Sequence, residues 1–161
     1  MTRWVRALGF VLLFSGGLLA QPRLTPLDEA GYQRTVASGK GKVVLVDFWA
    51  TYCKPCRAET PALVALESKL RAKGFLLVTV SADEAEQEAA AAKFIAGFKV
   101  PGPAYIRKAK DDDKFINSVD PKWNGALPAL FLYDRAGKKV KAWFGETSTR
   151  EVEAAVSKLL Q

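Results

Sequence analysis

Two nearly continuous apolar runs of strand length, joined by a helical repeat, constrain the fold of this chain most. Val43–Trp49 and Phe75–Val80 are nearly continuous in apolar residues, which is typical of strands covered on both faces. Residues 53–73 between them carry leucines at helical spacing, and Gly74 supplies the C′ position that ends the helix. Two strands joined in this way lie parallel with a right-handed crossover. The sequence therefore predicts an α/β fold built around this strand–helix–strand unit.

Two further helices are expected around this unit. Thr25 has the residue type of an N-cap and Pro26 suits the first helical position, which predicts a short helix that ends near Gly39. After the second strand, Asp83 is expected to cap an alanine-rich helix that stops at Gly97.

The C-terminal part predicts a hairpin followed by a helix. Ala129–Tyr133 and Lys139–Phe144 have strand patterns and are joined by a tight turn, so they should pair antiparallel, with lysines protecting an exposed edge or face. Ser148–Glu151 has the pattern of a capping box and precedes an amphipathic helix.

The segment Lys99–Asn124 is less regular than the rest of the chain. Pro101–Pro103 interrupts any repeat. The acidic run Asp111–Asp113 either begins a short helix through Val119, where it would complement the helix dipole, or forms a solvated loop. The sequence leaves both alternatives open.

Composition narrows the chemistry. The 161 residues include no histidine, which excludes Ser-His-Asp and Cys-His catalysis and every histidine-containing metal site. Only two cysteines are present, too few for a structural zinc site with four Cys or His ligands. The formal net charge is +7, but no basic stripe with interleaved aromatics accompanies it, so nucleic-acid binding is not expected. We expect no metal and no cofactor.

Residues 1–20 have the pattern of a signal peptide. Arg3 and Arg6 form a positive n-region, Ala7–Leu19 an apolar h-region, and Ala20 a small residue at the cleavage point. An uncleaved N-terminal anchor is the alternative, because Leu18 is larger than the ideal residue three positions before the cut. We therefore predict an exported protein, periplasmic or otherwise extracytoplasmic, which is soluble if the leader is cleaved and membrane-anchored if it is not.

The two cysteines are three residues apart at the start of the predicted helix. Residues i and i+3 of a helix have Cα atoms about 5 Å apart, within the range that a disulfide requires. The helix N-terminus, together with Lys54 and Arg57, favours a thiolate at Cys53, which predicts Cys53 as the nucleophile and Cys56 as the resolving thiol. A purely structural disulfide is the alternative, but so short a loop contributes only about 2 kcal/mol. We favour redox exchange.

The segment Val46–Pro61 resembles the active-site segment of thioredoxin-family proteins. Trp49-Ala-Thr51 before the cysteines and Glu59 after them are similar to the exported TlpA/ResA-like branch. The resemblance implies a thioredoxin fold, with a central mixed β-sheet flanked by helices, over a domain comprising residues 21–161. It also implies that Lys99–Asn124 is an insertion before the cis-proline strand.

The resemblance suggests roles for the neighbouring residues, each with an ordinary alternative. Asp47 matches the acid that assists deprotonation of the resolving cysteine, or is an acid at a strand end that reaches water. Glu59 matches an acid that manages protons in the exported branch, or is a surface carboxylate. Trp49 and Tyr52 either frame the site or belong to the core.

The segment before the hairpin completes the predicted substrate site. The resemblance implies that Pro128 is a cis-proline lying against the disulfide and that the backbone of Leu127 pairs with a bound substrate chain. Lys54 departs from the family, since cytoplasmic thioredoxins have glycine and exported reductases often an acid at this position.

These features predict a reductase or general disulfide exchanger for the thiols of exported proteins, with apocytochrome c as one candidate by analogy. A membrane electron donor would keep it reduced, and we expect a monomer. The alternatives are a disulfide oxidase or isomerase, a thiol peroxidase, and a Cu(I) carrier. The Pro-x-x-x-Thr-x-x-Cys context of peroxidases is absent, and the lack of histidine disfavours copper binding.

Overall fold

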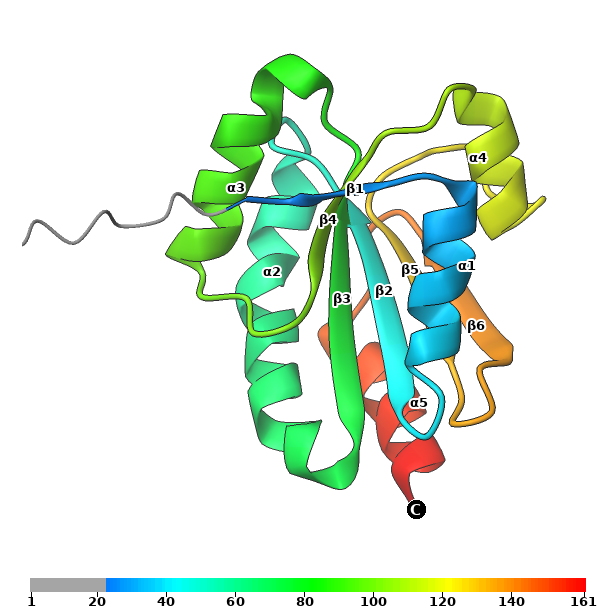
Figure 1. Cartoon of the computed structure of the whole chain (residues 1–161). Helices are drawn as coiled ribbons and strands as arrows, with labels where there is room; N and C mark the ends of the chain where they lie inside the picture. The colour runs from blue at the N-terminus through cyan, green and yellow to red at the C-terminus, as the bar shows by residue number, and fades with distance from the viewer. Residues whose placement is uncertain (1–22) are drawn as a thin grey trace, which may run out of the picture.

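The computed structural model describes residues 23–161, so the predicted leader lies outside the described residues. A six-stranded sheet of order β1-β4-β3-β2-β5-β6 forms its centre (Figure 1). The strands are β1 (Thr25–Leu27), β2 (Val43–Trp49), β3 (Phe75–Ser81), β4 (Ala104–Arg107), β5 (Ala129–Tyr133) and β6 (Lys139–Phe144). The first four in chain order run parallel, whereas β5 and β6 are antiparallel to their neighbours. The predicted mixed sheet is therefore confirmed.

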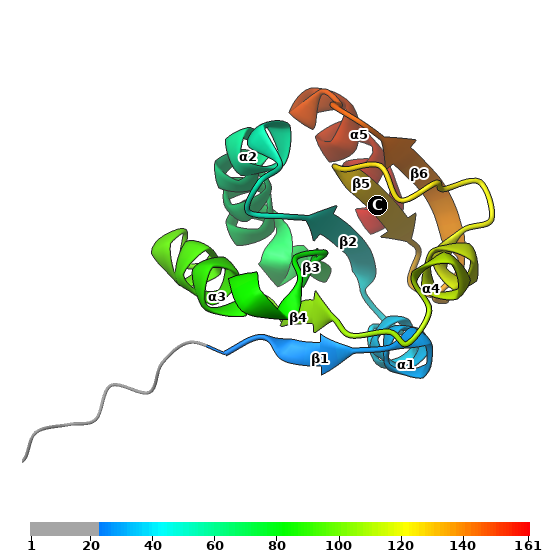
Figure 2. The same cartoon turned by 90° about the horizontal axis from the view of Figure 1, so that it is seen from above.

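Helices cover both faces of the sheet. They are α1 (Glu29–Ser38), α2 (Lys54–Leu70), α3 (Glu88–Gly97), α4 (Asp112–Val119) and α5 (Thr149–Leu160). Seen from above, α1 and α4 lie on one side, and α2, α3 and α5 on the other (Figure 2). The clusters of buried side chains follow the same division. None of the helices in residues 23–161 is long and apolar enough to cross a membrane.

Strand β2 is buried along its whole length, as its apolar run predicts. Its even-numbered residues lie in the core shared with α1 and α4, and its odd-numbered residues face the opposite layer, because side chains alternate along a strand. This alternation places Asp47 on the face covered by the helix that carries the cysteines.

Helix α2 starts and ends where the sequence predicts. Cys53 is its N-cap, Pro61 lies inside it, and a 3-10 turn (Arg71–Lys73) leads to Gly74. Gly74 has a φ of 92°, a left-handed conformation that glycine adopts without the cost of a Cβ atom.

The predicted helix start at Thr25 and Pro26 is wrong. Both residues belong to β1, which pairs in parallel with β4, and the buried side chain of Leu27 fixes this strand in the core. The helix begins later, with Asp28 as its N-cap, whose Oδ1 accepts a hydrogen bond of 2.7 Å from the backbone N–H of Gly31. The strand was missed because its partner is distant in sequence.

The predicted cap of the alanine-rich helix is also wrong. Asp83 is buried and points to the cysteine loop, where it accepts hydrogen bonds from Thr51. Helix α3 follows a 3-10 turn (Ala85–Gln87), and its N-cap residue Gln87 makes no side-chain capping bond.

The capping box predicted for the last helix does not form. Ser148 occupies the N-cap position, but its side chain makes no capping hydrogen bond. Glu151 instead accepts hydrogen bonds at Oε1 from Trp143 Nε1 and Lys141 Nζ, both of 2.8 Å. The tertiary contact with β6 takes the acid that a capping box would use.

The segment Lys99–Asn124 contributes to the sheet as well as to a helix. Strand β4 lies between β1 and β3. The acidic run begins helix α4, since Asp111 is the N-cap and its Oδ1 accepts from the backbone N–H of Lys114 at 2.9 Å. Of the two alternatives for this run, the helix is the correct one.

We predict that Gly102→Ala destabilises the protein. A Cβ atom on Gly102 would lie 1.8 Å from the carbonyl oxygen of Leu77, so β3 or the segment leading to β4 would have to move. Overpacking of this kind costs about 1–3 kcal/mol, so urea denaturation should show a loss in this range.

Gly97→Ala is the matched control. A Cβ on this helical residue meets no atom within 4 Å, and alanine should stabilise the helix by roughly 0.5–1 kcal/mol. Equal stability changes in the two variants would contradict the close approach at Gly102.

Candidate active site

The two cysteines lie where β2 gives way to α2. They form a disulfide with a Cα–Cα distance of 5.3 Å, close to the separation expected for helical neighbours. Cys53 keeps 7% of its surface exposed and Cys56 none. The backbone N–H of Cys56 donates to Cys53 Sγ at 3.3 Å. A thiolate at Cys53 would thus be stabilised by a free backbone N–H and by the helix dipole.

The loop before the cysteines is fixed by a buried carboxylate. Asp83 accepts hydrogen bonds from the backbone N–H of Thr51 at 3.0 Å, from Thr51 Oγ1 at 2.6 Å and from Ser81 Oγ at 2.7 Å. The backbone N–H of Ala82 donates to the carbonyl of Trp49 at 2.7 Å. The end of β3 therefore holds the cysteine loop, a role for Asp83 that the sequence did not suggest.

The aromatic residues next to the cysteines lie in different environments. Trp49 is buried in the same cluster as both cysteines, and its ring stacks on Phe94 with centroids 4.7 Å apart. The guanidinium group of Arg57 lies over the Phe94 ring, with its central carbon 5.7 Å from the ring centroid. Tyr52 is 73% exposed. Of the two residues predicted either to frame the site or to belong to the core, Tyr52 is therefore exposed and Trp49 is buried.

The segment before β5 approaches the same cluster. The Leu127–Pro128 peptide bond is cis, and the Leu127 side chain packs against the cluster that contains both cysteines. Trp123, at the end of the predicted insertion, donates from Nε1 to the carbonyl of Ala126 at 2.8 Å and so positions this segment. The carbonyl of Pro128 accepts from the backbone N–H of Gly145 at 2.8 Å.

Three acids lie on the α2 side of the site. Burial, and secondarily the charge of Glu59, raises the pKa of Asp47 well above its ordinary value. Burial, and secondarily the charge of Glu146, raises the pKa of Glu59 to about 7. Asp47 Oδ1 and Glu59 Oε1 are buried without a hydrogen-bond partner. Asp47 thus does not reach water as a strand-end acid would. Glu59 is half-buried, whereas a surface carboxylate would be fully exposed.

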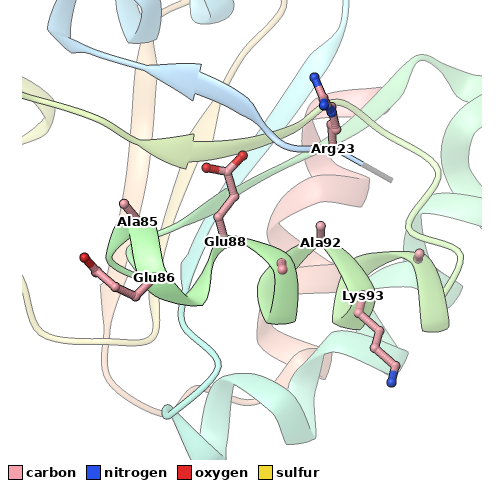
Figure 3. Close-up of a pocket in the computed structure, with 8 residues that line it drawn as sticks. Arg23, Ala85, Glu86, Glu88, Ala92 and Lys93 are labelled. Atoms are coloured by element: carbon pink, nitrogen blue, oxygen red, sulfur yellow. The ribbon is translucent and has the colours of Figure 1, made fainter. Parts of the chain in front are cut away.

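A hollow of about 780 Å³ lies between α3 and Arg23 (Figure 3). Several alanines of α3 and the preceding turn line it, and Glu86 and Lys93 point away from Arg23 in this view. No residue of the cysteine motif contributes to this hollow, so we assign it no part in the chemistry of the disulfide.

Comparison with known proteins identifies the family. The sequence pattern of the AhpC/TSA family matches residues 20–142. The chain belongs to the AhpC/TSA family. A relative named thiol-disulfide oxidoreductase ResA, from Bacillus cereus, is 32% identical over 138 residues, which is 86% of this chain and 75% of the relative.

Solved structures place this AhpC/TSA family member among thioredoxin-fold proteins. The thioredoxin domain of a thiol-disulfide oxidoreductase from Bacteroides vulgatus is 30% identical, with a TM-score of 0.65 over 78% of this chain and 84% of that one. A thiol:disulfide interchange protein from Bacteroides sp. is 32% identical, with a TM-score of 0.61 over 76% of each chain. The predicted thioredoxin fold is confirmed, and the chain, with its Cys-x-x-Cys pair, is a thiol–disulfide oxidoreductase.

We predict that Cys53 reacts before Cys56 in the reduced protein, because Cys53 is the more exposed and lies at the helix N-terminus. Limited alkylation with iodoacetamide, followed by mass mapping, should label Cys53 at least about tenfold faster. In denaturant, the control, both cysteines should react at similar rates. Preferential labelling of Cys56 in the folded protein would reverse the assigned roles.

We predict that Asp47→Asn stabilises the protein at neutral and alkaline pH. The pKa of Asp47 is raised on folding, so the folded state binds this proton more tightly than the unfolded state does. The protein therefore loses stability as pH rises from the pKa of the unfolded chain, about 4, to the higher pKa of the folded protein. Asparagine removes this loss. Urea denaturation should show no gain at pH 3 and, at pH 8, a gain of about 1–3 kcal/mol, the cost of a buried polar group without a partner.

Asp113→Asn serves as the control for this measurement, because Asp113 is an exposed acid on α4. It should show no comparable growth of stability with pH. A stability difference for Asp47→Asn that stays constant from pH 3 to pH 8 would contradict an uncompensated buried carboxylate.

Proposed function

We propose that the protein is an exported reductase that transfers electrons from the Cys53/Cys56 dithiol to disulfides of other exported proteins. The observation that carries this proposal is the placement of Cys53 at the N-cap of α2, with Cys56 fully buried behind it. An attacking thiolate at the surface and a shielded resolving thiol are the two parts that disulfide exchange requires.

The reaction takes place in two balanced steps. The Cys53 thiolate attacks one sulfur of a substrate disulfide, which forms a mixed disulfide and releases the other sulfur as a thiolate. Cys56 then loses its proton and attacks Cys53 Sγ, which forms the Cys53–Cys56 disulfide and releases the second substrate thiolate. Two electrons pass from the dithiol to the substrate.

The buried acids manage the proton of the resolving step. Asp47 lies on the β2 face covered by α2, and its raised pKa makes it a stronger base than an exposed aspartate. Glu59, one helical turn beyond Cys56, has a pKa of about 7 and exchanges protons at neutral pH. We assign Asp47 as the acceptor of the Cys56 proton and Glu59 as the group that passes it on.

The substrate chain binds beside the disulfide. The backbone of Leu127 would pair with an extended substrate by strand addition, with Pro128 fixing the direction of this segment. Tyr52, directly before Cys53, supplies an exposed aromatic surface. A site of this kind recognises main chain more than side chains, which suits several substrates, with apocytochrome c as one candidate by analogy.

The leader and the family support the cellular setting that we propose. Residues 1–20 have the pattern of an export signal or an N-terminal anchor, so the domain would act outside the cytoplasm. A membrane electron donor would return the disulfide to the dithiol, and the protein would act as a monomer.

We predict a reduction potential near that of thioredoxin, about −270 mV. The exposed Lys54 beside the nucleophile favours the thiolate and makes the pair more oxidising, but such a charge contributes under about 1 kcal/mol. Because 30 mV corresponds to about 1.4 kcal/mol, Lys54 shifts the potential by no more than about 20 mV, against about 150 mV between thioredoxin and DsbA. Equilibration with glutathione measures this potential.

Lys54→Gln is the control and should lower the potential by no more than about 20 mV. A wild-type value near about −120 mV would make the protein an oxidase and contradict the reductase proposal. Insulin reduction, peroxide turnover and copper titration separate the reductase from the thiol peroxidase and the Cu(I) carrier.

A further inference from the structure

We propose that Glu146, in the loop between β6 and α5, is a positioning residue that sets the proton affinity of Glu59 and so the pH range of the resolving step. This inference rests on the proposed function, because it concerns the proton that leaves Cys56. It adds to the cysteine helix an acid from a part of the chain that the active-site motif does not include.

The first observation is a cleft that brings the two glutamates together. A cleft of about 260 Å³ next to the cysteine pair is lined by Pro55, Ala58, Glu59, Glu146 and Thr147. Glu146 is exposed, whereas Oε1 of Glu59 is buried and has no hydrogen-bond partner. The cleft therefore connects the half-buried Glu59 with solvent, and the exposed Glu146 lines the same cleft.

The second observation is that the loop is held in place. Gly145 has a φ of 83°, which turns the chain at the end of β6, and its N–H donates to the carbonyl of Pro128 at 2.8 Å. On the other side of Glu146, the backbone N–H of Glu151 donates to the carbonyl of Ser148 at 2.9 Å, where α5 begins. Glu146 is thus fixed between the cis-proline segment and α5.

The third observation is that, in the described part of the chain, no basic side chain forms an ion pair with these acids. Arg57 on α2 lies over Phe94 instead, and Lys54 and Arg150 are exposed on α2 and α5. Within residues 23–161, neither Glu59 nor Glu146 forms an ion pair. A like charge nearby disfavours the ionised form, so Glu146 raises the pKa of Glu59.

The three acids form a series that becomes progressively more buried. Glu146 is exposed, Glu59 is half-buried, and Asp47 is 2% exposed. The charge of Glu146 acts on Glu59, and that of Glu59 acts on Asp47. A proton taken from Cys56 by Asp47 would pass to Glu59 and leave through the cleft. Burial, with the charge of Glu146 as the second cause, keeps Glu59 half protonated near neutral pH, so that Glu59 can both accept and release this proton.

The test separates attack from resolution. Reduced protein is mixed with Ellman's reagent in a stopped-flow instrument between pH 5 and pH 9. The first release of thionitrobenzoate reports attack by Cys53, and the second reports resolution by Cys56. We expect Glu146→Gln to shift the pH midpoint of the second phase downward by roughly 0.3–1 pH unit, because loss of the like charge lowers the pKa of Glu59. The rate of the first phase should be the same in this variant as in the wild-type protein.

Three further variants complete the experiment. Glu146→Lys should move the midpoint further in the same direction, since it replaces repulsion by attraction. Glu86→Gln, which removes the same charge from the exposed turn before α3, should leave the midpoint unchanged. Glu59→Gln should remove the ionisation from the second phase, and thermal unfolding should show that each variant is folded.

The outcomes distinguish this inference from the proposed function. Unchanged midpoints in both Glu146 variants, with the ionisation lost in Glu59→Gln, would overturn the role of Glu146 and leave the role of Glu59 intact. An unchanged profile in Glu59→Gln would overturn both roles. Failure of the wild-type protein to reduce insulin would count against the proposed function itself.

Discussion

The burial of β2 between two layers of helices is the constraint on which the rest of the structure depends. Both faces of this strand are covered. Its side chains point alternately to the two faces, so each neighbouring helix packs against one face of the sheet. The strand ends at Trp49 and leads directly into the loop before α2. Because β2 cannot shift without exposing two cores, the cysteine pair at its end is fixed relative to the whole sheet.

The site is held rigidly on one side and left electrostatically unfavourable on the other. Asp83 and the end of β3 fix the loop before Cys53 through several hydrogen bonds. On the α2 side, Asp47 and Glu59 each hold one buried oxygen without a hydrogen-bond partner, which costs folding free energy. Both acids have a raised pKa, and that of Glu59 lies at about 7. This combination suits a site that moves protons and electrons while its backbone remains in place.

Much of the fold could be predicted because it follows from local patterns. The apolar runs identified β2 and β3, and the leucine repeat identified α2 with its end at Gly74. β1 and β4 escaped prediction because each is short and is defined by pairing with a distant strand. Two of the three failed caps have a common cause, since Asp83 and Glu151 both make tertiary contacts in place of local ones.

The candidate site was predictable where a local motif or the family resemblance marks its residues, as it does for the cysteines and for Leu127 and Pro128. The cysteines, Asp47 and Glu59 lie within one short segment and were found from it, whereas Glu146 joins them only through folding. The electrostatic environment of Glu59 depends on this long-range approach, and no pattern around Glu146 indicates it.

The pairing of β1 with β4 has a consequence for the order in which the domain can form. Thr25 lies opposite Tyr105, so the first strand of the described chain waits for a partner that is synthesised eighty residues later (105 minus 25). In a chain that emerges N-terminus first, β1 therefore cannot join the sheet until β4 has been synthesised, when about two-thirds of the chain is available. The pairing of β1 with β4 therefore closes a long loop, and it connects the beginning of the domain to its middle.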